Sequence, residues 1–554
     1  MQTPTQRVQR AIELRVKLAD YYATVPIPEH VSHGDDDHYA TENYFASYTK
    51  GLPHSGPLGE VDPHAYRALL RALETGEPAD FADVPLGGLN DPNTRQPLTD
   101  PQCGLAFDLE GIDSHLLTIP PAYAFASPGA IGEIAENYWM ALARDVAFVD
   151  YGTGANTDLD TPSGSLTAHA AADLSQYAVF NGPKSGGAVT TGTLFRGMTA
   201  GDLVGPYVSQ FLLLDVPFGS ERFEQKIALA VPEQPFMIQP AEWLAVQQGA
   251  KPAPAPTFVA KPKYMYRGRD LGNYVHIDEL YQAYLNACLL LITPNARGGL
   301  SAPLNPGNPY PGSNQMGFGT LGEPNFKVIV AEVATRALKA VWFQKWFVHR
   351  RPRPELYAGR IHHKLANTPG ADKYPFHPGQ FAKLQATVLP KVLTKNGGAS
   401  HLLPMAFPEG SPTHPAYGAG HATVAGACIT VLKALFDGDA LIKPLIQAAQ
   451  RSTGGNWFVA QPGNDGMTLI PYGQPDADQM TVGGELEKLA GNIGLARNFA
   501  GVHWRSDYWE SLKFGEQVAL HFLRETVMTY NENVYFTIRK LDGTQVTITK
   551  RGFE

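Results

Sequence analysis

The sequence predicts a mainly α protein, a large helical bundle with irregular loops and a short C-terminal β-hairpin. In most of the long segments the apolar residues recur at spacings of three and four, which is the period of one helix face. Alternation of polar and apolar residues, the pattern of a strand, appears near the C-terminus around Asp542-Gly543, a turn dipeptide. With 554 residues and 44% hydrophobic content, the chain can bury the core that such a bundle needs.

Apolar periodicity and helix-capping residues together set the predicted helices. They cover residues 5–24, 63–75, 129–145, 272–293, 326–350, 378–394, 421–436, 484–499 and 507–529. Asn325 and Ser506 stand immediately before two of these ranges and are predicted to cap them. We expect residues 1–554 to fold as one unit, with 325–530 as its functional core.

The remaining segments are rich in Gly, Pro and polar residues and are predicted to be irregular. Residues 25–57 form a loop in which Asp35 to Asp37 are interpreted as a solvated acidic turn in preference to a metal site. Residues 150–265 are mixed and end in a breaker-rich stretch, KPAPAPTF. Residues 294–324 form a loop, and a long irregular stretch follows residue 436.

Composition excludes several classes of protein. The net charge is −9 and there is no basic stripe, so no nucleic-acid partner is expected. Cys103, Cys288 and Cys428 lie far apart, which favours neither a disulfide framework nor a zinc cluster. No stretch of 18 uncharged apolar residues exists, so no membrane span is predicted. The N-terminus has the pattern of an amphipathic helix and not of a signal peptide, and we expect a cytoplasmic or otherwise soluble protein.

The first segment with chemical potential runs from Lys345 to Pro354. Lys345 lies near the end of a predicted helix, and Pro352 and Pro354 bracket Arg353. Two prolines force the chain out of the helix, so Arg353 is held on a stiff corner where its planar guanidinium can grip an oxyanion. Taken alone, the segment is more typical of a basic helix end stabilised by the helix dipole.

The second segment is Gly418-Ala-Gly420-His421, followed by an apolar helix. Glycines before a helix start let an anion approach the free amide groups of the first turn. His421 stands at this helix start and can exchange a proton near neutral pH. The alternative is an ordinary glycine loop with a histidine at a helix start.

The third segment places Arg497 six residues before His503. Gly501 between them suggests that the helix ends and the chain turns, so that both side chains reach one ligand. Asp507 follows His503 by four residues and can accept the second N–H of its imidazole. The alternative is a helix-end arginine and a surface histidine. Four other histidines, His349, His362, His363 and His401, are interpreted as surface or loop residues.

Taken together, the three segments offer three cations, a helix start and two imidazoles, which are the parts of a pocket for a tetrahedral oxyanion such as phosphate or vanadate. Their order and spacing, K-x7-R-P, then G-H, then R-x5-H, resemble the vanadium-dependent haloperoxidases, whose anion site is shared with the type 2 phosphatidic acid phosphatase superfamily. The wider motifs KWxVHRxxRPE, EGSPTHPxYxxGHATVAGA and GVHWRSDYWESL resemble the algal and cyanobacterial bromoperoxidase branch. The resemblance covers most of the chain and is strongest over 325–530.

This resemblance implies a vanadate site between helices. His503 would bond vanadium, and His421 would act as acid and base. The groups implied to hydrogen-bond the vanadate oxygens are Lys345, Arg353, Arg497 and the amide of Gly420. The resemblance also associates His414 with halide reactivity and Trp342 with the aromatic lining of the site. Many relatives have a serine where this chain has Ala419, so weaker cofactor retention or altered halide preference is a hypothesis for this chain.

The resemblance further implies an enzyme that oxidises halide, with bromide favoured, using hydrogen peroxide. Its product, a hypohalous-acid equivalent, would halogenate small organic substrates. A homo-oligomer, a dimer or larger, is also implied. The main alternative is an acid phosphatase with a phosphohistidine at His503 and His421 as proton donor. A non-catalytic binding or assembly protein is a third interpretation. Structural calcium is not predicted, because the loop near 306–319 has no acidic side chain.

Overall fold

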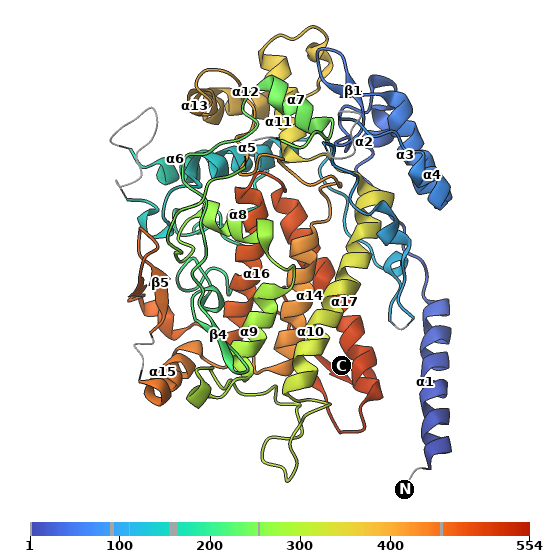
Figure 1. Cartoon of the computed structure of the whole chain (residues 1–554), viewed down its shortest axis with the longest axis vertical. Coiled ribbons are helices and arrows are strands. Elements are labelled where there is room, and N and C mark those ends of the chain that lie inside the picture. Colours follow the sequence, from blue (N-terminus) through green and yellow to red (C-terminus); the bar gives the residue numbers. More distant parts are fainter. Residues whose placement is uncertain are drawn as a thin grey trace.

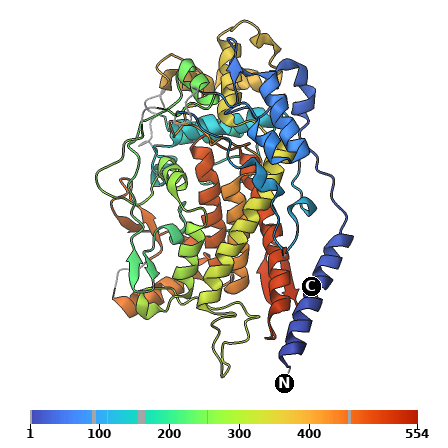
Figure 2. The same ribbon diagram turned by 45° about the vertical axis from the view of Figure 1, so that its right-hand side comes forward.

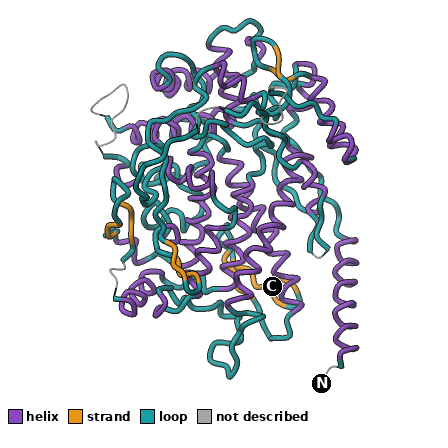
Figure 3. The backbone as a smooth tube through the Cα atoms, viewed as in Figure 1, coloured by secondary structure: helices purple, strands orange, loops and turns teal. Residues whose placement is uncertain are grey.

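The computed structural model describes residues 3–88, 94–109, 111–153, 164–252, 255–454 and 458–553. Long helices stand side by side in the centre of the molecule, and loops and shorter helices surround them (Figure 1). Strands are few and lie at the periphery (Figure 3). The mainly α fold with irregular loops and a C-terminal hairpin is therefore confirmed. No helix among the described residues has both the length and the apolar character needed to cross a bilayer.

The helices, in chain order, are α1 (Pro4–Thr24), α2 (Asp35–His38), α3 (Pro63–Thr75), α4 (Pro78–Ala82), α5 (Pro128–Ala143), α6 (Leu166–Leu174), α7 (Pro240–Gln247), α8 (Gly268–Ile277), α9 (Gln282–Ile292), α10 (Glu323–Phe343), α11 (Pro354–Leu365), α12 (Pro378–Ala386), α13 (Val388–Lys395), α14 (Gly420–Leu435), α15 (Ile442–Thr453), α16 (Val482–Phe499) and α17 (Arg505–Thr529). A single π-helical turn, Gln344–His349, follows α10 directly.

Among the described residues, the strands form four small antiparallel sheets. Three of them are pairs, made by β1 (His54–Ser55) with β2 (Glu60–Val61), β3 (Val216–Phe218) with β4 (Glu221–Phe223), and β5 (Ala460–Pro462) with β6 (Leu469–Pro471). The fourth is the predicted C-terminal hairpin, β7 (Phe536–Arg539) with β8 (Gln545–Thr549), extended by β9 (Gly552–Phe553). Phe536 pairs with Ile548 in the hairpin, and both side chains are buried against the helices.

Four helices, α10, α14, α16 and α17, make the centre of the bundle and meet at one end. The helices α14 and α17 begin at this end, whereas α10 and α16 finish there. Glycines bring α14 and α17 into close contact. A Cβ atom on Gly426 would lie 1.9 Å from the carbonyl oxygen of Leu512, and one on Gly515 would lie 1.9 Å from that of Thr423. The close approach fixes the two helix starts relative to each other.

Most of the predicted helices are confirmed, but several boundaries differ for identifiable reasons. The predicted helix 272–293 is two helices, because Asp278 ends α8 in extended geometry. The range 378–394 is likewise split at Thr387. The stretch after residue 436, predicted to be irregular, contains α15. The predicted single unit of 1–554 with a core at 325–530 stays a prediction, although one hydrophobic cluster runs from Tyr39 to Ile548.

Two predicted helix caps are wrong. Gly322 precedes α10, and the side chain of Asn325 instead accepts a hydrogen bond from the Leu321 amide. Ser506 lies inside α17, whose start is closed by the Asp507 carboxylate accepting from the Trp504 amide at 3.0 Å. In both cases the helix begins before the best capping residue in the sequence, two residues before Asn325 and one residue before Ser506.

Several polar residues predicted to face solvent are buried. Asp35 and Asp36 are buried, and Asp36 pairs with Arg350 at 2.5 Å, so of the predicted acidic turn only Asp37 is exposed to solvent. His349, His362 and His363 are also buried, contrary to the prediction of surface positions. The segment around residues 30–66 covers the π-helical turn, which explains the burial of both Asp36 and His349.

The contact of α14 with α17 leads to a stability prediction. We expect Gly426→Ala to lower the stability of the protein by about 2 kcal/mol or more, because the new methyl group must push two backbones apart. Thermal unfolding at one scan rate measures this as a lower Tm. The matched control is Gly379→Ala in α12, where a Cβ atom meets nothing within 4 Å and helix propensity favours alanine. Equal Tm values for the two variants would contradict the close-packing interpretation.

Candidate active site

The three sequence segments come together where the four central helices meet. Lys345 lies in the π-helical turn after α10, and Arg353 lies immediately before α11. Gly420 and His421 are the first two residues of α14, Arg497 is in the last turn of α16, and His503 lies just before α17. The turned view shows the same convergence at the upper end of the bundle (Figure 2). The site is thus built from helix ends.

Lys345 is directed inward by the π-helical turn. The regular helix stops at Phe343, and the turn closes at Arg350, which has a φ of 39°. The Lys345 ammonium is fully buried and donates to the carbonyl oxygens of Pro415 at 2.9 Å and Ala416 at 3.4 Å. Burial lowers the pKa of Lys345 well below its usual range, and the neighbouring charge of Arg353 lowers this pKa further. An anion in the pocket would favour its charged form.

Arg353 is the most extensively bonded cation of the site. Its backbone is extended, with φ −76° and ψ 155°, as the flanking prolines require. The guanidinium donates to the carbonyl oxygens of His414 at 2.9 Å and Val502 at 2.6 Å. It also donates to Nδ1 of His414 at 2.9 Å and approaches Nε2 of His503 at 3.1 Å. Burial, followed by the charge of Arg497, lowers the pKa of Arg353 to about 10.

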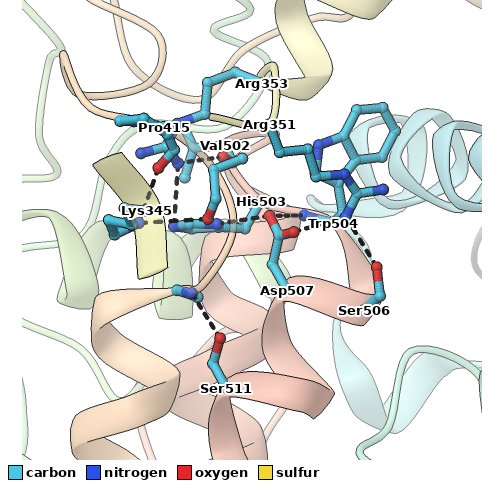
Figure 4. Close-up of polar contacts among 12 residues, drawn as sticks. Lys345, Arg351, Arg353, Pro415, Val502, His503, Trp504, Ser506, Asp507 and Ser511 are labelled. Atoms are coloured by element: carbon cyan, nitrogen blue, oxygen red, sulfur yellow. Dashed lines mark hydrogen bonds and ion pairs between the residues drawn. The ribbon is translucent and has the colours of Figure 1, made fainter. Parts of the chain in front are cut away.

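His503 is oriented by a buried carboxylate (Figure 4). Its Nδ1 atom lies 2.9 Å from Oδ2 of Asp507, which assigns the proton to Nδ1 and leaves a lone pair on Nε2. Burial holds the pKa of His503 well below its usual range, and Arg353 is the next cause. The neutral imidazole therefore presents Nε2 toward Arg353 and the pocket.

Arg351 anchors this carboxylate from behind. It donates to Asp507 Oδ1 at 2.7 Å and to Glu133 of α5 at 2.7 Å, and both ion pairs are buried. The guanidinium lies 4.6 Å from the centroid of the Trp504 ring. Asp507 is thereby committed to Arg351 and His503 and leaves the pocket cations without a carboxylate.

The start of α14 supplies open amide groups. The first hydrogen bond within the helix runs from the Thr423 amide to the Ala419 carbonyl at 2.9 Å, so the amides of Gly420, His421 and Ala422 precede it. The Ala419 amide is taken by the hydroxyl of Ser511, 2.7 Å away on α17. A Cβ atom on Gly420 would lie 3.1 Å from the Trp342 ring, so glycine keeps this approach open.

His421 has a carboxylate partner of its own. Its Nε2 atom lies 3.0 Å from Oδ1 of Asp278, which leaves Nδ1 as the atom that can exchange a proton. Burial lowers the pKa of His421, whereas the hydrogen bond to Asp278 and its charge act in the opposite direction. His421 keeps 17% of its side chain exposed, so the proton can pass between the pocket and solvent.

Arg497 has a buried N–H group that is not hydrogen-bonded within the described residues. Its guanidinium donates to the Val275 carbonyl of α8 at 2.9 Å and lies 6.0 Å from the centroid of the Phe407 ring. Its Nε atom is buried and has no hydrogen-bond partner among the residues that the structure describes. Burial lowers the pKa of Arg497 to about 10. A buried N–H donor without an acceptor is costly, so the pocket favours a ligand that accepts hydrogen bonds.

The charge balance of the pocket also favours an anionic ligand. Within the described part of the chain, no carboxylate forms an ion pair with Lys345, Arg353 or Arg497, since the nearby ones bind Arg351 and His421. Three buried cations, open helix amides and the Nε2 lone pair of His503 make a donor set that fits a tetrahedral oxyanion.

The two lining residues lie beside the cations. The His414 and Trp342 rings are 4.9 Å apart between centroids, and the Lys345 ammonium lies 5.4 Å from the Trp342 ring. Burial lowers the pKa of His414 well below its usual range, with Lys345 as the next cause. Ala419 is buried and adds no hydrogen-bonding group from its side chain.

The structure thus brings together every residue that the sequence motifs singled out, and it adds others that the motifs did not. Asp278 was hidden inside a range predicted to be one helix, although the acidic pair Asp278-Glu279 within that mostly apolar range was a usable signal. Nothing in the sequence distinguished Arg351 from the other three basic residues of its segment. Its partner Glu133 lies more than 200 residues away from it in the sequence. The individual roles of the site residues remain predictions.

Comparison with known proteins defines the class. The family model described as "VCPO second helical-bundle domain" matches residues 392–532, the region that contains α14, α16 and α17. A homohexameric vanadate-dependent bromoperoxidase from Ascophyllum nodosum has a similar structure, with a TM-score of 0.87, 28% identity, and coverage of 99% of this chain and 91% of that chain. The fold is that of a helical-bundle vanadium haloperoxidase.

Sequence relatives narrow the class to one family. The chain is 35% identical to a vanadium-dependent bromoperoxidase of Corallina pilulifera over 91% of both proteins. It is 33% identical to that of Corallina officinalis over 98% of both, and 32% identical to that of Ascophyllum nodosum over 92% of this chain and 87% of the relative. The chain belongs to the vanadium-dependent bromoperoxidase family.

Ala419 gives a prediction about anion affinity. We expect Ala419→Ser to tighten vanadate binding by roughly five- to tenfold, because a hydroxyl at the start of α14 adds one hydrogen bond to a charged partner, worth about 1 kcal/mol or somewhat more. Equilibrium dialysis with vanadate measures the affinity of both proteins, and their Tm values check that the fold is unchanged. Equal affinities would show that position 419 does not contact the ligand.

Proposed function

We propose that this chain binds vanadate in the pocket of Lys345, Arg353 and Arg497 and oxidises bromide with hydrogen peroxide. The product is a hypohalous-acid equivalent that halogenates small organic molecules. The observation that carries the proposal is the set of three buried cations without carboxylate partners around the unprotonated Nε2 atom of His503. The names of relatives that match over nine-tenths or more of this chain support the same activity.

In this proposal each donor has a defined task. His503 Nε2 would bond vanadium, and the vanadate oxygens would be held by Lys345, Arg353, Arg497 and the Gly420 amide. Bound vanadate supplies a Lewis-acid centre that activates hydrogen peroxide without a change in its own oxidation state. Asp507 keeps the His503 proton on Nδ1, so that Nε2 stays available.

Proton movement falls to His421. Its Nδ1 atom takes a proton from the incoming peroxide and returns one to the departing oxygen, while Asp278 holds the opposite N–H. His414 and Trp342 line the approach, where His414 would influence halide reactivity. The burial of the cations keeps bulk water from competing for them and strengthens their attraction for an anion.

An acid phosphatase is the alternative that the pocket also suits. Phosphate and vanadate are both tetrahedral oxyanions, and His503 Nε2 is oriented as a phosphoryl acceptor would be. The long match to proteins named bromoperoxidases favours the haloperoxidase proposal. We also propose that the chain forms a homo-oligomer, since the structural neighbour from Ascophyllum nodosum is described as homohexameric.

The main test is bromination of a small phenol with hydrogen peroxide, with and without added vanadate. We expect activity to depend on vanadate and His503→Ala to reduce it by at least about a thousandfold, since Nε2 is the direct ligand. The control is His401→Ala, which changes a histidine outside the pocket. Bromination that ignores vanadate would defeat the proposal. Phosphate-ester hydrolysis by the metal-free protein, without bromination after vanadate loading, would favour the phosphatase.

Asp278 leads to a prediction about pH dependence. The Asp278 charge raises the pKa of His421, so Asp278→Asn lowers that pKa. His421 must be deprotonated to accept a proton, and the acid limb of the pH–activity profile therefore moves to lower pH. We also expect kcat to fall by roughly tenfold, because the ring loses its charged anchor. The control, Asp439→Asn, changes a largely exposed carboxylate. An unmoved acid limb would show that His421 does not control it.

A further inference from the structure

The N-terminal helix α1 is well formed but stands beside the bundle and contributes little to it (Figures 1 and 2). Thr3 and Gln6 form a reciprocal capping box, with distances of 3.3 Å and 2.9 Å, and Pro4 occupies the first turn. None of its 21 residues, all of which the structure describes, is buried. The sequence therefore specifies a helix here whose apolar residues the bundle covers only in part.

One apolar stripe of α1 serves the contact with its own bundle. Leu14, Leu18 and Tyr22 follow each other at intervals of four residues and are half-buried. At the end of this stripe the Tyr22 hydroxyl donates to Glu525 of α17. The Arg524 guanidinium lies 4.3 Å from the centroid of the neighbouring Tyr21 ring. A helix that packs on a single neighbour needs only one such stripe.

A second apolar stripe of α1 is left exposed in the single chain. Val8, Ile12 and Val16 also follow each other at intervals of four residues, and their exposed fractions are 60%, 47% and 54%. Each residue of this stripe lies six positions before its counterpart in the stripe that contacts the bundle. The two stripes are therefore about 120° apart around the helix axis. Three branched apolar side chains in one exposed row form a continuous surface of the kind that a protein partner covers.

The charge of α1 indicates the chemistry of that partner. The helix carries four basic residues, Arg7, Arg10, Arg15 and Lys17, against two acidic ones, Glu13 and Asp20. The whole chain has a net charge of −9. A basic helix is attracted to a partner of opposite net charge, and a second copy of this chain carries such a charge.

We propose that the stripe of Val8, Ile12 and Val16 docks on a second copy of this chain. This inference rests on the homo-oligomer of the proposed function and assigns one of its contact surfaces. The match to the homohexameric neighbour covers 99% of this chain, a share that cannot leave out a helix of 21 residues. A membrane surface is the less favoured occupant, because the stripe has no Trp, Phe or Leu to anchor in the interface.

The test compares three full-length proteins loaded with vanadate. The first is the unchanged chain, and the second carries Val8→Glu, Ile12→Glu and Val16→Glu. Glutamate is a better helix former than valine, so α1 stays helical. The third, the matched control, carries Gln6→Glu and Lys17→Glu on the polar side of α1 and changes the net charge by the same −3. Light scattering across a dilution series gives the molar mass, and bromination per subunit reports on the site.

We expect an oligomer for the unchanged chain and for the control. The stripe variant should associate more weakly by at least about a hundredfold and keep its activity per subunit, since α1 contacts Glu525 of α17, about 18 residues or about 27 Å along the helix from Asp507. An unchanged mass for the stripe variant would overturn this inference and leave the oligomer standing. A monomeric unchanged chain would overturn both, and flotation of that monomer with anionic vesicles would assign the stripe to a membrane.

Discussion

The buried carboxylate of Asp507 is the interaction on which the site depends. It accepts from His503, from the Trp504 amide and from Arg351, so one side chain orients the imidazole, closes the start of α17 and ties that start to Glu133 of α5. Breaking a buried pair of this kind typically costs about 3–5 kcal/mol, because the remaining charge is left uncompensated. The same group thus holds the fold together and selects the tautomer that the chemistry needs.

With its carboxylates committed elsewhere, the pocket keeps three cations that repel each other. Arg353 lowers the pKa of Lys345, and Arg497 lowers that of Arg353. A flexible site would relieve this repulsion by letting the side chains swing apart into water. Here the carbonyl groups of Pro415, Val502 and Val275 fix them, and the close contact of α14 with α17 prevents expansion. The packing of the helices therefore holds the three cations close enough together to favour an oxyanion between them.

The features that follow from local sequence were predictable, and those that follow from tertiary contact were not. Periodicity located the central helices, and the paired prolines located the corner at Arg353. The π-helical turn left no mark in the pattern, because its residues continue the apolar spacing of α10. Asp278 and Arg351 act on site residues more than 140 residues away in sequence, so no local rule could assign them. His349 has an ionisable side chain, which predicts a surface position, but it is buried. Its burial depends on segments that cover it only in the folded chain.

Because of the π-helical turn, the geometry of the site depends on the exact number of residues between α10 and Arg353. Such a turn holds one residue more than an α-helical turn of the same rise. Removing Gln344 alone would restore a regular α-helical turn and change the direction in which the side chains of this turn, Lys345 among them, point. Every site residue and the K-x7-R-P spacing would still be present in the sequence. Insertions and deletions, harmless in the loop of 294–324, would here inactivate a protein whose motifs all looked intact.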